Sequence, residues 1–176
     1  DPLDGTKSFV RDTPFFSTQI ALLRDGELVL GVSSACACDE LACAEKGRGA
    51  FLNGRPIRVS AVDRLDAAIL STGNLKSLAA SPQWADFGAL VGRVNRLRGY
   101  GDFVHYHLLA RGALDLVVES DVNILDIAAL AVIVREAGGH FTDLSGGPVG
   151  LGTTTVLASN GLLHDTVLQA LHFPGC

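Results

Sequence analysis

The sequence predicts a layered α+β fold, because its first half is rich in strand patterns and its second half alternates helix and strand patterns. Apolar runs at 18–24 and 27–33 are joined by Asp25 and Gly26, a pair typical of a two-residue hairpin. Strand-and-turn character continues through 47–59. The alternation in the second half favours helices that pack against mixed sheets.

The remaining elements are expected at short, well-separated segments. Strands are expected at 41–45, 68–71, 96–98, 114–119, 140–142 and 154–158. Helices are expected from residue 82 onward, after Ser81 as N-cap, and at 103–110, 127–137 and 162–171. Glycines at 112, 138 and 139 are expected to end the second and third of these helices.

Length and composition predict a single domain over residues 1–176. The chain has 176 residues, of which 48% are hydrophobic, and this is enough for one substantial core. The formal net charge of -5 and the lack of a Lys/Arg run argue against a nucleic-acid-binding surface. A small anionic substrate is compatible with this charge where bound cations face it.

The sequence also predicts a cytoplasmic protein without a membrane segment. No apolar stretch approaches the roughly 20 residues of a membrane helix, and the chain opens with an Asp-Pro pair instead of a basic and apolar leader. The cysteines do not follow a CxxC pattern, which disfavours a zinc or redox site. Reduced structural thiols are expected at Cys36, Cys38, Cys43 and Cys176.

Two carboxylates lie three residues apart at the start of the chain, in the segment DPLDGT. Asp1 and Asp4 can face one point, because the proline fixes the backbone and Gly5 permits a tight approach. Hard cations such as Mg²⁺ prefer oxygen ligands of this kind. The amides of Gly5 and Thr6 can receive a phosphate, particularly where a helix starts. The alternative is a solvated turn whose acids serve only turn hydrogen bonds.

Two segments resemble signatures of the inositol-monophosphatase-like phosphatases. DPLDGTKSF at 1–9 is similar to the DPxDGTxxF signature of that family, and 125–129 with 134–139 is similar to its WDxAA and EAGG segments. Two motifs in the family's order are far more specific than either motif alone. The resemblance covers essentially the whole chain and implies a layered αβαβα sandwich of the inositol monophosphatase and fructose-1,6-bisphosphatase type.

Two departures from the family pattern qualify this expectation. Leu125 stands where the family usually has Trp, and this packing change is expected to loosen the loop more than it removes chemistry. Family members also carry a segment before the first motif, with a glutamate that ligates metal, whereas this chain opens on the motif without Met. The fold is therefore expected to be N-terminally truncated, with one metal ligand missing.

The resemblance implies a Mg²⁺ site that joins the two motifs. Its metal ligands would be the carboxylates of Asp1, Asp4 and Asp126 together with the carbonyl of Leu3. Thr6 would orient a water for in-line attack on phosphorus, and Asp1, Asp4, Thr6 and Asp126 would form the catalytic set. The alternative for Asp126 is a plain helix N-cap.

The segment RGYGDF at 98–103 resembles the form found in the histidinol-phosphate phosphatases of this family. Acids at Asp102 and Glu119 would attract the ammonium group of such a substrate, whereas a neutral polyol needs only hydrogen bonds. The alternatives are that Asp102 caps a helix and that Glu119 is a solvated strand-end residue. His105 and His107 are expected to be structural, since a spacing of two directs them to different helix faces.

The expected function is Mg²⁺-dependent hydrolysis of a small phosphomonoester, with histidinol phosphate preferred, which would place the enzyme in histidine biosynthesis. One alternative is an inositol monophosphatase or bisphosphate nucleotidase of the same family. Another is a catalytically weak fragment that retains a binding or assembly role, because the upstream glutamate is missing. A homodimer is possible on the family resemblance alone.

Overall fold

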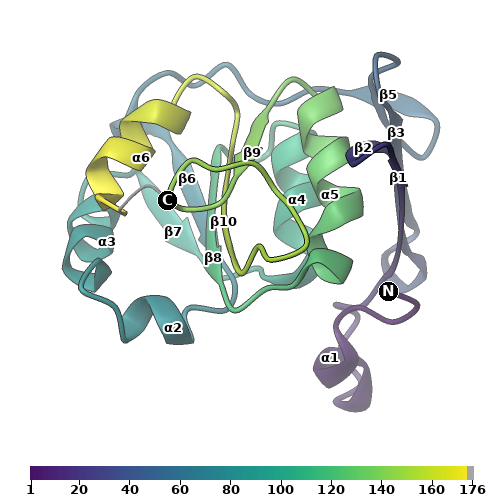
Figure 1. The fold of residues 1–176 in the computed structure, drawn as a ribbon, viewed down its shortest axis with the longest axis horizontal. Coiled ribbons are helices and arrows are strands. Elements are labelled where there is room, and N and C mark those ends of the chain that lie inside the picture. The colour runs from purple at the N-terminus through teal and green to yellow at the C-terminus, as the bar shows by residue number, and fades with distance from the viewer. Residues whose placement is uncertain (174–176) are drawn as a thin grey trace.

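Two five-stranded sheets, two groups of helices and the separate short helix α1 make up the fold (Figure 1). The computed structural model describes residues 1–173. The helices are α1 Thr6–Val10, α2 Lys76–Ala79, α3 Trp84–Val91, α4 Asp102–Ala110, α5 Ile124–Glu136 and α6 His164–Leu171. The strands are β1 Thr18–Arg24, β2 Glu27–Ala35, β3 Glu40–Glu45, β4 Ala50–Leu52, β5 Arg55–Ile57, β6 Ile69–Thr72, β7 Arg96–Arg98, β8 Leu116–Ser120, β9 His140–Thr142 and β10 Thr155–Ser159.

The first sheet is an antiparallel meander with the order β1-β2-β3-β4-β5. Its turns follow from local sequence. Asp25 and Gly26 have φ values of 52° and 81°, and Asn53 and Gly54 have 50° and 74°. Positive φ at both central residues matches the twist of the flanking strands, and Asn, Asp and Gly adopt it most readily. The hairpin turn predicted at Asp25 and Gly26 is therefore confirmed, and Asn53 and Gly54 form a second one.

The second sheet is mixed, with the order β7-β6-β8-β10-β9. Strand β6 pairs in parallel with β7 and β8, whereas β10 pairs antiparallel with β8 and β9. The central strands β8 and β10 are buried almost throughout, in accord with their apolar sequences LVVES and TVLAS. A strand covered on both faces needs such a run, because neither face meets water.

The layers alternate between helix and sheet. Helices α4 and α5 lie between the two sheets, and α2, α3 and α6 cover the far face of the second sheet (Figure 1). The layered α+β fold is thus confirmed, and four of the five predicted layers, in the order αβαβ, occur within residues 1–173. In that range, no helix layer covers the outer face of the first sheet, which would be the fifth layer.

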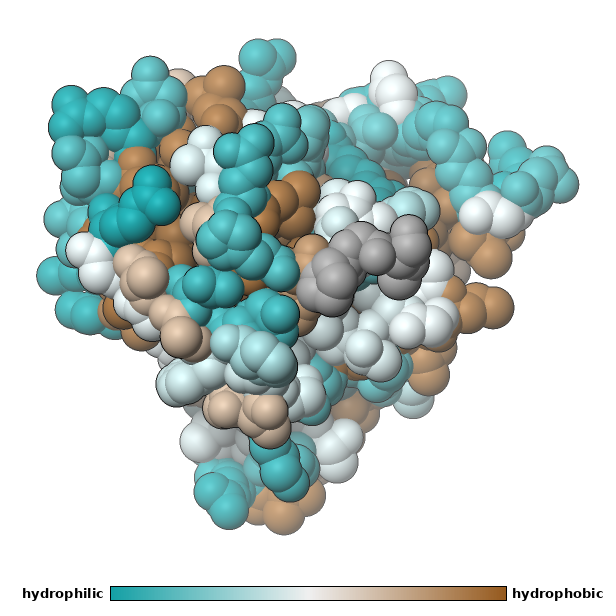
Figure 2. Space-filling view, turned by 60° about the vertical axis from the view of Figure 1, so that its left-hand side comes forward, coloured by the Kyte–Doolittle hydropathy of each residue, from teal (hydrophilic) through white to brown (hydrophobic). Residues whose placement is uncertain are grey.

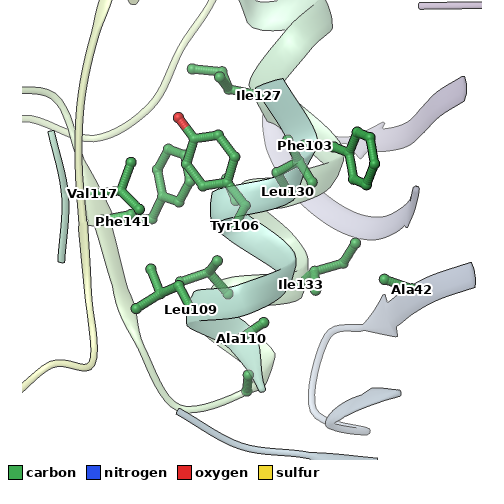
Figure 3. Close-up of a cluster of buried hydrophobic side chains, with 14 of the residues drawn as sticks. Ala42, Phe103, Tyr106, Leu109, Ala110, Val117, Ile127, Leu130, Ile133 and Phe141 are labelled. Carbon is green, nitrogen blue, oxygen red and sulfur yellow. The ribbon is translucent and has the colours of Figure 1, made fainter. Parts of the chain in front are cut away.

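Helix α5 is apolar on nearly all sides because it packs on both sheets. All eight residues from Ile127 to Val134 are buried. A helix that is hydrophobic all round is stable only when it is enclosed. Side chains of α4 and α5 interdigitate in the close-up of the core, among them Phe103, Leu130 and Ile133 (Figure 3). Each such buried side chain contributes about 1.5–3 kcal/mol.

The first sheet and α5 approach each other at backbone contact distance. A Cβ atom placed on Gly31 of β2 would overlap the carbonyl oxygen of Ala129 in α5. Glycine is needed here because both neighbours are backbone held in regular structure. Since α5 also carries Asp126, this contact fixes how far Asp126 lies from the first sheet.

The outer helix layer meets solvent. Figure 2 shows this side of the molecule, where hydrophobic residues surface in separate patches among hydrophilic ones. Every helix within residues 1–173 is too short or too polar to cross a lipid bilayer. Cys36, Cys38 and Cys43 are free, in accord with the predicted thiols, and Cys176 lies outside the described residues.

Several boundaries differ from the prediction. Helix α3 begins at Trp84, and Ser81 donates its hydroxyl to the carbonyl of Leu78 instead of capping α3. Helix α5 begins three residues earlier than predicted, after Asn123 as N-cap. The four-residue helix α2 was not predicted, because one turn is too short to show a period of apolar residues.

A buried histidine ties α6 to the second sheet and predicts a pH effect on stability. The ring nitrogens of His164 lie 2.9 Å from Ser159 Oγ and 3.0 Å from Thr142 Oγ1. Burial, with a smaller contribution from His140, lowers the pKa of His164 from 6.5 to about 4. The folded state then binds fewer protons than the unfolded state between these values, so stability falls as pH drops through that window.

Lowering the pH from 7 to 5 should therefore shift the urea midpoint of the wild-type protein downward relative to that of His164→Gln, whatever the other groups contribute to both proteins. The exposed His172 gives the matched control, because His172→Gln should retain the wild-type pH dependence. The same pH dependence in wild type and His164→Gln would show that His164 does not contribute to the acid sensitivity.

Candidate active site

The first acidic motif is held against the start of β1. Asp4 and Ser17 exchange two backbone hydrogen bonds of 2.9 and 3.0 Å, which form an isolated β-bridge. The Ser17 hydroxyl also donates to Asp4 Oδ2 at 3.4 Å. Asp1 accepts a 2.8 Å hydrogen bond from the Leu3 amide through Oδ1. Both carboxylates are therefore fixed by their own short segment.

Helix α1 begins directly after this motif, as the phosphate hypothesis for Gly5 and Thr6 requires. Gly5 is its N-cap with φ 79°, and an added Cβ would overlap the Phe15 carbonyl oxygen. Thr6 is exposed, and its hydroxyl donates to the Leu3 carbonyl at 2.9 Å. Two residues predicted to act at the metal site, Leu3 and Thr6, are thus in direct contact.

Asp126 lies at the third position of α5, where it completes a capping box. Its Oδ2 accepts from the Asn123 amide at 3.1 Å and from Asn123 Nδ2 at 2.7 Å. Asn123 Oδ1 in turn accepts from the Leu125 amide at 2.8 Å. The alternative that Asp126 is the helix N-cap is wrong, because Asn123 is the N-cap and Asp126 is the third residue of the helix. The box holds one carboxylate oxygen and leaves Oδ1 for other contacts.

The structure brings together the three carboxylates predicted to hold a metal. One oxygen each from Asp1, Asp4 and Asp126 lies within 4.8 Å of the others. The first two come from the segment before β1 and the third from α5, more than 120 positions away. Hard divalent cations take such oxygen ligands, so the donor set fits Mg²⁺.

The electrostatics of the cluster favour a bound cation. Burial, followed by the charges of Asp126 and Asp102, raises the pKa of Asp4 from 3.8 to about 7. Asp4 is 8% exposed. A carboxyl that holds its proton this strongly is short of compensating positive charge. A divalent cation would supply that charge and displace the proton.

Two adjoining cavities open beside the cluster. The smaller, of about 80 Å³, includes Asp4 and Asp126 in its lining, and the larger, of about 260 Å³, is lined by residues 72–74, 99–102 and Glu119. Asn74, Asp102 and Glu119 line both. Neither cavity has Lys or Arg among the described residues that line it. An anionic phosphate could enter this acidic site only with a cation.

Glu119 is buried at the end of β8, so the solvated alternative is wrong. It is 4% exposed, and it accepts from the Tyr106 hydroxyl at 2.8 Å and from the Asn74 amide at 3.1 Å. Burial acts to raise the pKa of Glu119, but the neighbouring His105 and these hydrogen bonds outweigh it and lower that pKa. Glu119 is therefore a charged carboxylate in the cavity wall.

Asp102 stands at the first position of α4 with a strained backbone, at φ 45°. Gly101 occupies the N-cap and makes no side-chain cap, so the helix-capping alternative for Asp102 is wrong. The Ser8 hydroxyl donates to Asp102 Oδ2 at 3.4 Å. Burial, then the charge of Glu119, raises the pKa of Asp102. A non-glycine residue at positive φ beside a cavity is typical of a functional site.

A larger cavity of about 590 Å³, which Asp1 also lines, lies between β1, α5 and the 149–151 loop. Its lining is mostly apolar and offers few groups for phosphate chemistry, so we place the reaction at the acidic cavities. Leu125, at the family's Trp position, lines this larger cavity and is 62% exposed. Within residues 1–173 its side chain is therefore not part of a hydrophobic core.

Comparison with known proteins identifies the family. Residues 1–174, which include both motifs, match the inositol monophosphatase family. The chain belongs to this family. Its relatives are named as phosphatases, so the chain is an enzyme of the inositol monophosphatase family.

Individual family members agree with this assignment. The chain is 46% identical to the histidinol-phosphatase of Mycobacterium tuberculosis, with 98% of this chain and 68% of that protein covered. It is 38% identical to the fructose-1,6-bisphosphatase/inositol-1-monophosphatase of Thermotoga maritima, with 98% and 66% covered. The crystal structure of the extragenic suppressor protein suhB from Bartonella henselae matches with a TM-score of 0.88 at 36% identity, with 98% and 67% covered. The chain thus spans about two thirds of these proteins.

The sequence did not indicate every residue of this inositol monophosphatase family site. Tyr106 lies on α4, stacked on Phe141 with ring centroids 5.4 Å apart, and its hydroxyl lies at the edge of the core cluster (Figure 3). Gly73 leaves no room for a Cβ beside Glu119 Oε1. A lone Tyr in a helix and a lone Gly after a strand carry no motif, so only the three-dimensional contacts reveal them.

Proposed function

We propose that the protein is a Mg²⁺-dependent phosphatase that acts on histidinol phosphate. The observation that carries this proposal is the pair of adjoining cavities, one beside the Asp1, Asp4 and Asp126 cluster and the other walled by Asp102 and Glu119. The identity of 46% to a histidinol-phosphatase supports the same substrate. Histidinol phosphate joins a phosphate to a cationic body, and the two cavities offer a place for each.

The metal would be held by Asp1, Asp4 and Asp126, with the Leu3 carbonyl as a further oxygen ligand. When bound, Mg²⁺ neutralises phosphate charge and lowers the pKa of a coordinated water. The β-bridge at Asp4 and the capping box at Asp126 hold two of these carboxylates in place before any cation arrives. Such support reduces the reorganisation that metal binding requires.

The remaining residues of the first motif would handle the phosphate and the water. The amides of Gly5 and Thr6 lie at the start of α1, where the first backbone N–H groups have no partner within the helix and can receive an anion. Thr6 already donates its hydroxyl to the Leu3 carbonyl, so its oxygen can accept a hydrogen bond from the attacking water. Thr6 would thereby orient the water.

The cationic body of the substrate would lie in the 260 Å³ cavity, against Asp102 and Glu119. Both carboxylates stand in a partly enclosed site, where a charge-assisted hydrogen bond is stronger than in water. A bound ammonium would also offset the burial and, after it, the repulsion by Glu119 that raise the pKa of Asp102.

The second candidate substrate is inositol phosphate. It is favoured by relatives named as inositol-1-monophosphatases, of which the one from Mesorhizobium japonicum is 33% identical over 99% of this chain. A neutral polyol would hydrogen-bond to the same two acids without needing their charge. Loss of the negative charge at residue 102 should therefore impair the reaction of histidinol phosphate much more than that of inositol phosphate.

Asp102→Asn tests this directly. We expect kcat/KM for histidinol phosphate to fall by about 10–100-fold, since a hydrogen bond to a charged group is worth about 1.5–3 kcal/mol. For inositol 1-phosphate the change should stay within about threefold. Asn tolerates positive φ, so the backbone at residue 102 should not change.

The measurement is Mg²⁺-dependent phosphate release from both substrates, using this chain and a longer version to which the N-terminal segment expected from the family is added. A wild type that prefers inositol 1-phosphate would contradict the histidinol phosphate assignment. Activity only in the longer protein would support the prediction that a metal ligand lies upstream, and would leave this chain as a weakly active fragment. The predicted homodimer stays a prediction, to be checked by light scattering.

A further inference from the structure

A buried row of polar side chains lies behind the wall of the 260 Å³ cavity. It consists of Ser71 at the end of β6, His105 on α4 and Glu119 on β8. Ser71 and His105 are fully buried, at 0% exposure. Three polar side chains in such a position each cost free energy unless their partners satisfy them. Their contacts therefore indicate what they hold in place.

The hydrogen bonds of the row run in a defined direction. The Tyr100 amide donates to Ser71 Oγ at 3.3 Å, so the Ser71 hydroxyl hydrogen can point to His105 Nδ1, also at 3.3 Å. Nδ1 then accepts, which places the ring hydrogen on Nε2. Within the described chain His105 Nε2 forms no hydrogen bond, but it lies 3.2 Å from Glu119 Oε2, close enough for the ring hydrogen and the carboxylate to attract each other electrostatically.

Each end of the row meets a different wall of the cavity. Glu119 is one wall, and the loop of Gly99, Tyr100 and Gly101 is another. Ser71 holds this loop through the Tyr100 amide, and His105 joins Ser71 to Glu119. The spacing between the two walls thus depends on a side chain that does not itself line the cavity.

The order Ser, His and Glu is that of a nucleophilic triad, but a nucleophilic role does not fit. Ser71 is fully buried, and its oxygen already accepts from the Tyr100 amide. A nucleophile needs an oxygen that a substrate can reach. The row is therefore a support for the cavity.

We propose that His105 is a positioning residue that sets the preference of the cavity for a cationic substrate body. This inference rests on the proposed function. His105 holds Glu119 charged and fixed opposite the 99–101 loop, so that an ammonium group meets both Asp102 and Glu119. A neutral polyol, which depends less on fixed charge, gains less from the same support.

Three substitutions at His105 separate positioning from a merely structural role. His105→Leu removes both polar contacts, His105→Asn keeps an amide near Ser71 but cannot reach Glu119, and His105→Gln extends a donor toward Glu119. The readouts are calorimetric binding of L-histidinol without Mg²⁺ and kcat/KM for histidinol phosphate and inositol 1-phosphate. Thermal unfolding of each variant monitors folding.

We expect His105→Leu and His105→Asn to weaken L-histidinol binding by about tenfold or more, with a similar loss for histidinol phosphate. For inositol 1-phosphate the loss should stay within about threefold, and His105→Gln should recover most of the preference. If His105→Leu does not fold, Ser71→Ala carries the test, because it frees the 99–101 loop and should lower the preference in the same way.

The outcomes distinguish the two proposals. A wild type that neither binds L-histidinol nor prefers histidinol phosphate contradicts the proposed function and removes the basis of this inference. A wild type with the preference, together with a folded His105→Leu variant that retains it, overturns the inference alone. Equal losses for both substrates in every folded variant would likewise overturn it, because the row would then be structural only.

Discussion

Asp4→Asn should reduce Mg²⁺-dependent phosphate release at least about 100-fold. Mutation of a residue that only contacts a metal ligand already reduces metal affinity or activity by about 10–100-fold, and Asp4 is expected to be a ligand itself. The same substitution should not destabilise the metal-free protein. The raised pKa of Asp4 means that the folded state binds more protons than the unfolded state between pH 3.8 and about 7. Ionised Asp4 therefore lowers the stability of the metal-free protein as pH rises through that window, and Asn removes this effect.

The measurement is thermal unfolding at pH 8 with a chelator, beside phosphate release with Mg²⁺. Asp4→Asn should unfold at the same or a higher temperature than wild type while it is almost inactive. Asp63→Asn, at an exposed acid away from the cluster, should match wild type in both assays. An active Asp4→Asn enzyme would show that Asp4 is not a metal ligand.

Gly31→Ala should destabilise the fold by about 1–3 kcal/mol, because its Cβ would overlap the backbone of α5 at Ala129. Neither β2 nor α5 can yield easily at this contact. The sheet and the helix must separate, and Asp126 then moves away from Asp1 and Asp4. We therefore expect weaker Mg²⁺ binding together with lower stability, although residue 31 lies outside the acidic cluster.

Gly88→Ala is the matched control. Gly88 lies in α3 with nothing within 4 Å of an added Cβ, so Ala should be neutral or stabilising by up to about 1 kcal/mol. Chemical denaturation and a Mg²⁺ titration of both variants make the comparison. If Gly31→Ala has wild-type stability, the sheet and α5 do not depend on the close approach at this residue.

The sequence was most informative where local chemistry alone determines structure. The turns at Asp25 and Asn53 need positive φ, and the residues there adopt it readily. The apolar run at 127–137 predicted the helix α5, although its first turn escaped the pattern because Asn123, Leu125 and Asp126 are polar or exposed. Strand order depends on contacts distant in sequence and was not predictable from local patterns.

The residues of the candidate site likewise fall into those that the sequence indicated and those that only the structure reveals. Asp1, Asp4 and Asp126 lie in motifs that the sequence displays, and the structure places them together. Their role as metal ligands stays a prediction. Three further residues contact Glu119 but belong to no sequence motif: Asn74, His105 and Tyr106. Their contacts form only when α4, β6 and β8 pack together, so the sequence did not indicate them.

The most direct test of the acidic cluster is Mn²⁺ anomalous scattering from crystals of the protein, compared with crystals of Asp126→Asn. Mn²⁺ takes the same oxygen ligands as Mg²⁺ and is visible by its anomalous signal. We expect a peak between the carboxylates of Asp1, Asp4 and Asp126 in the wild type, and a weaker peak or none in the variant. A wild-type crystal saturated with Mn²⁺ but without a peak among these three residues would contradict this expectation.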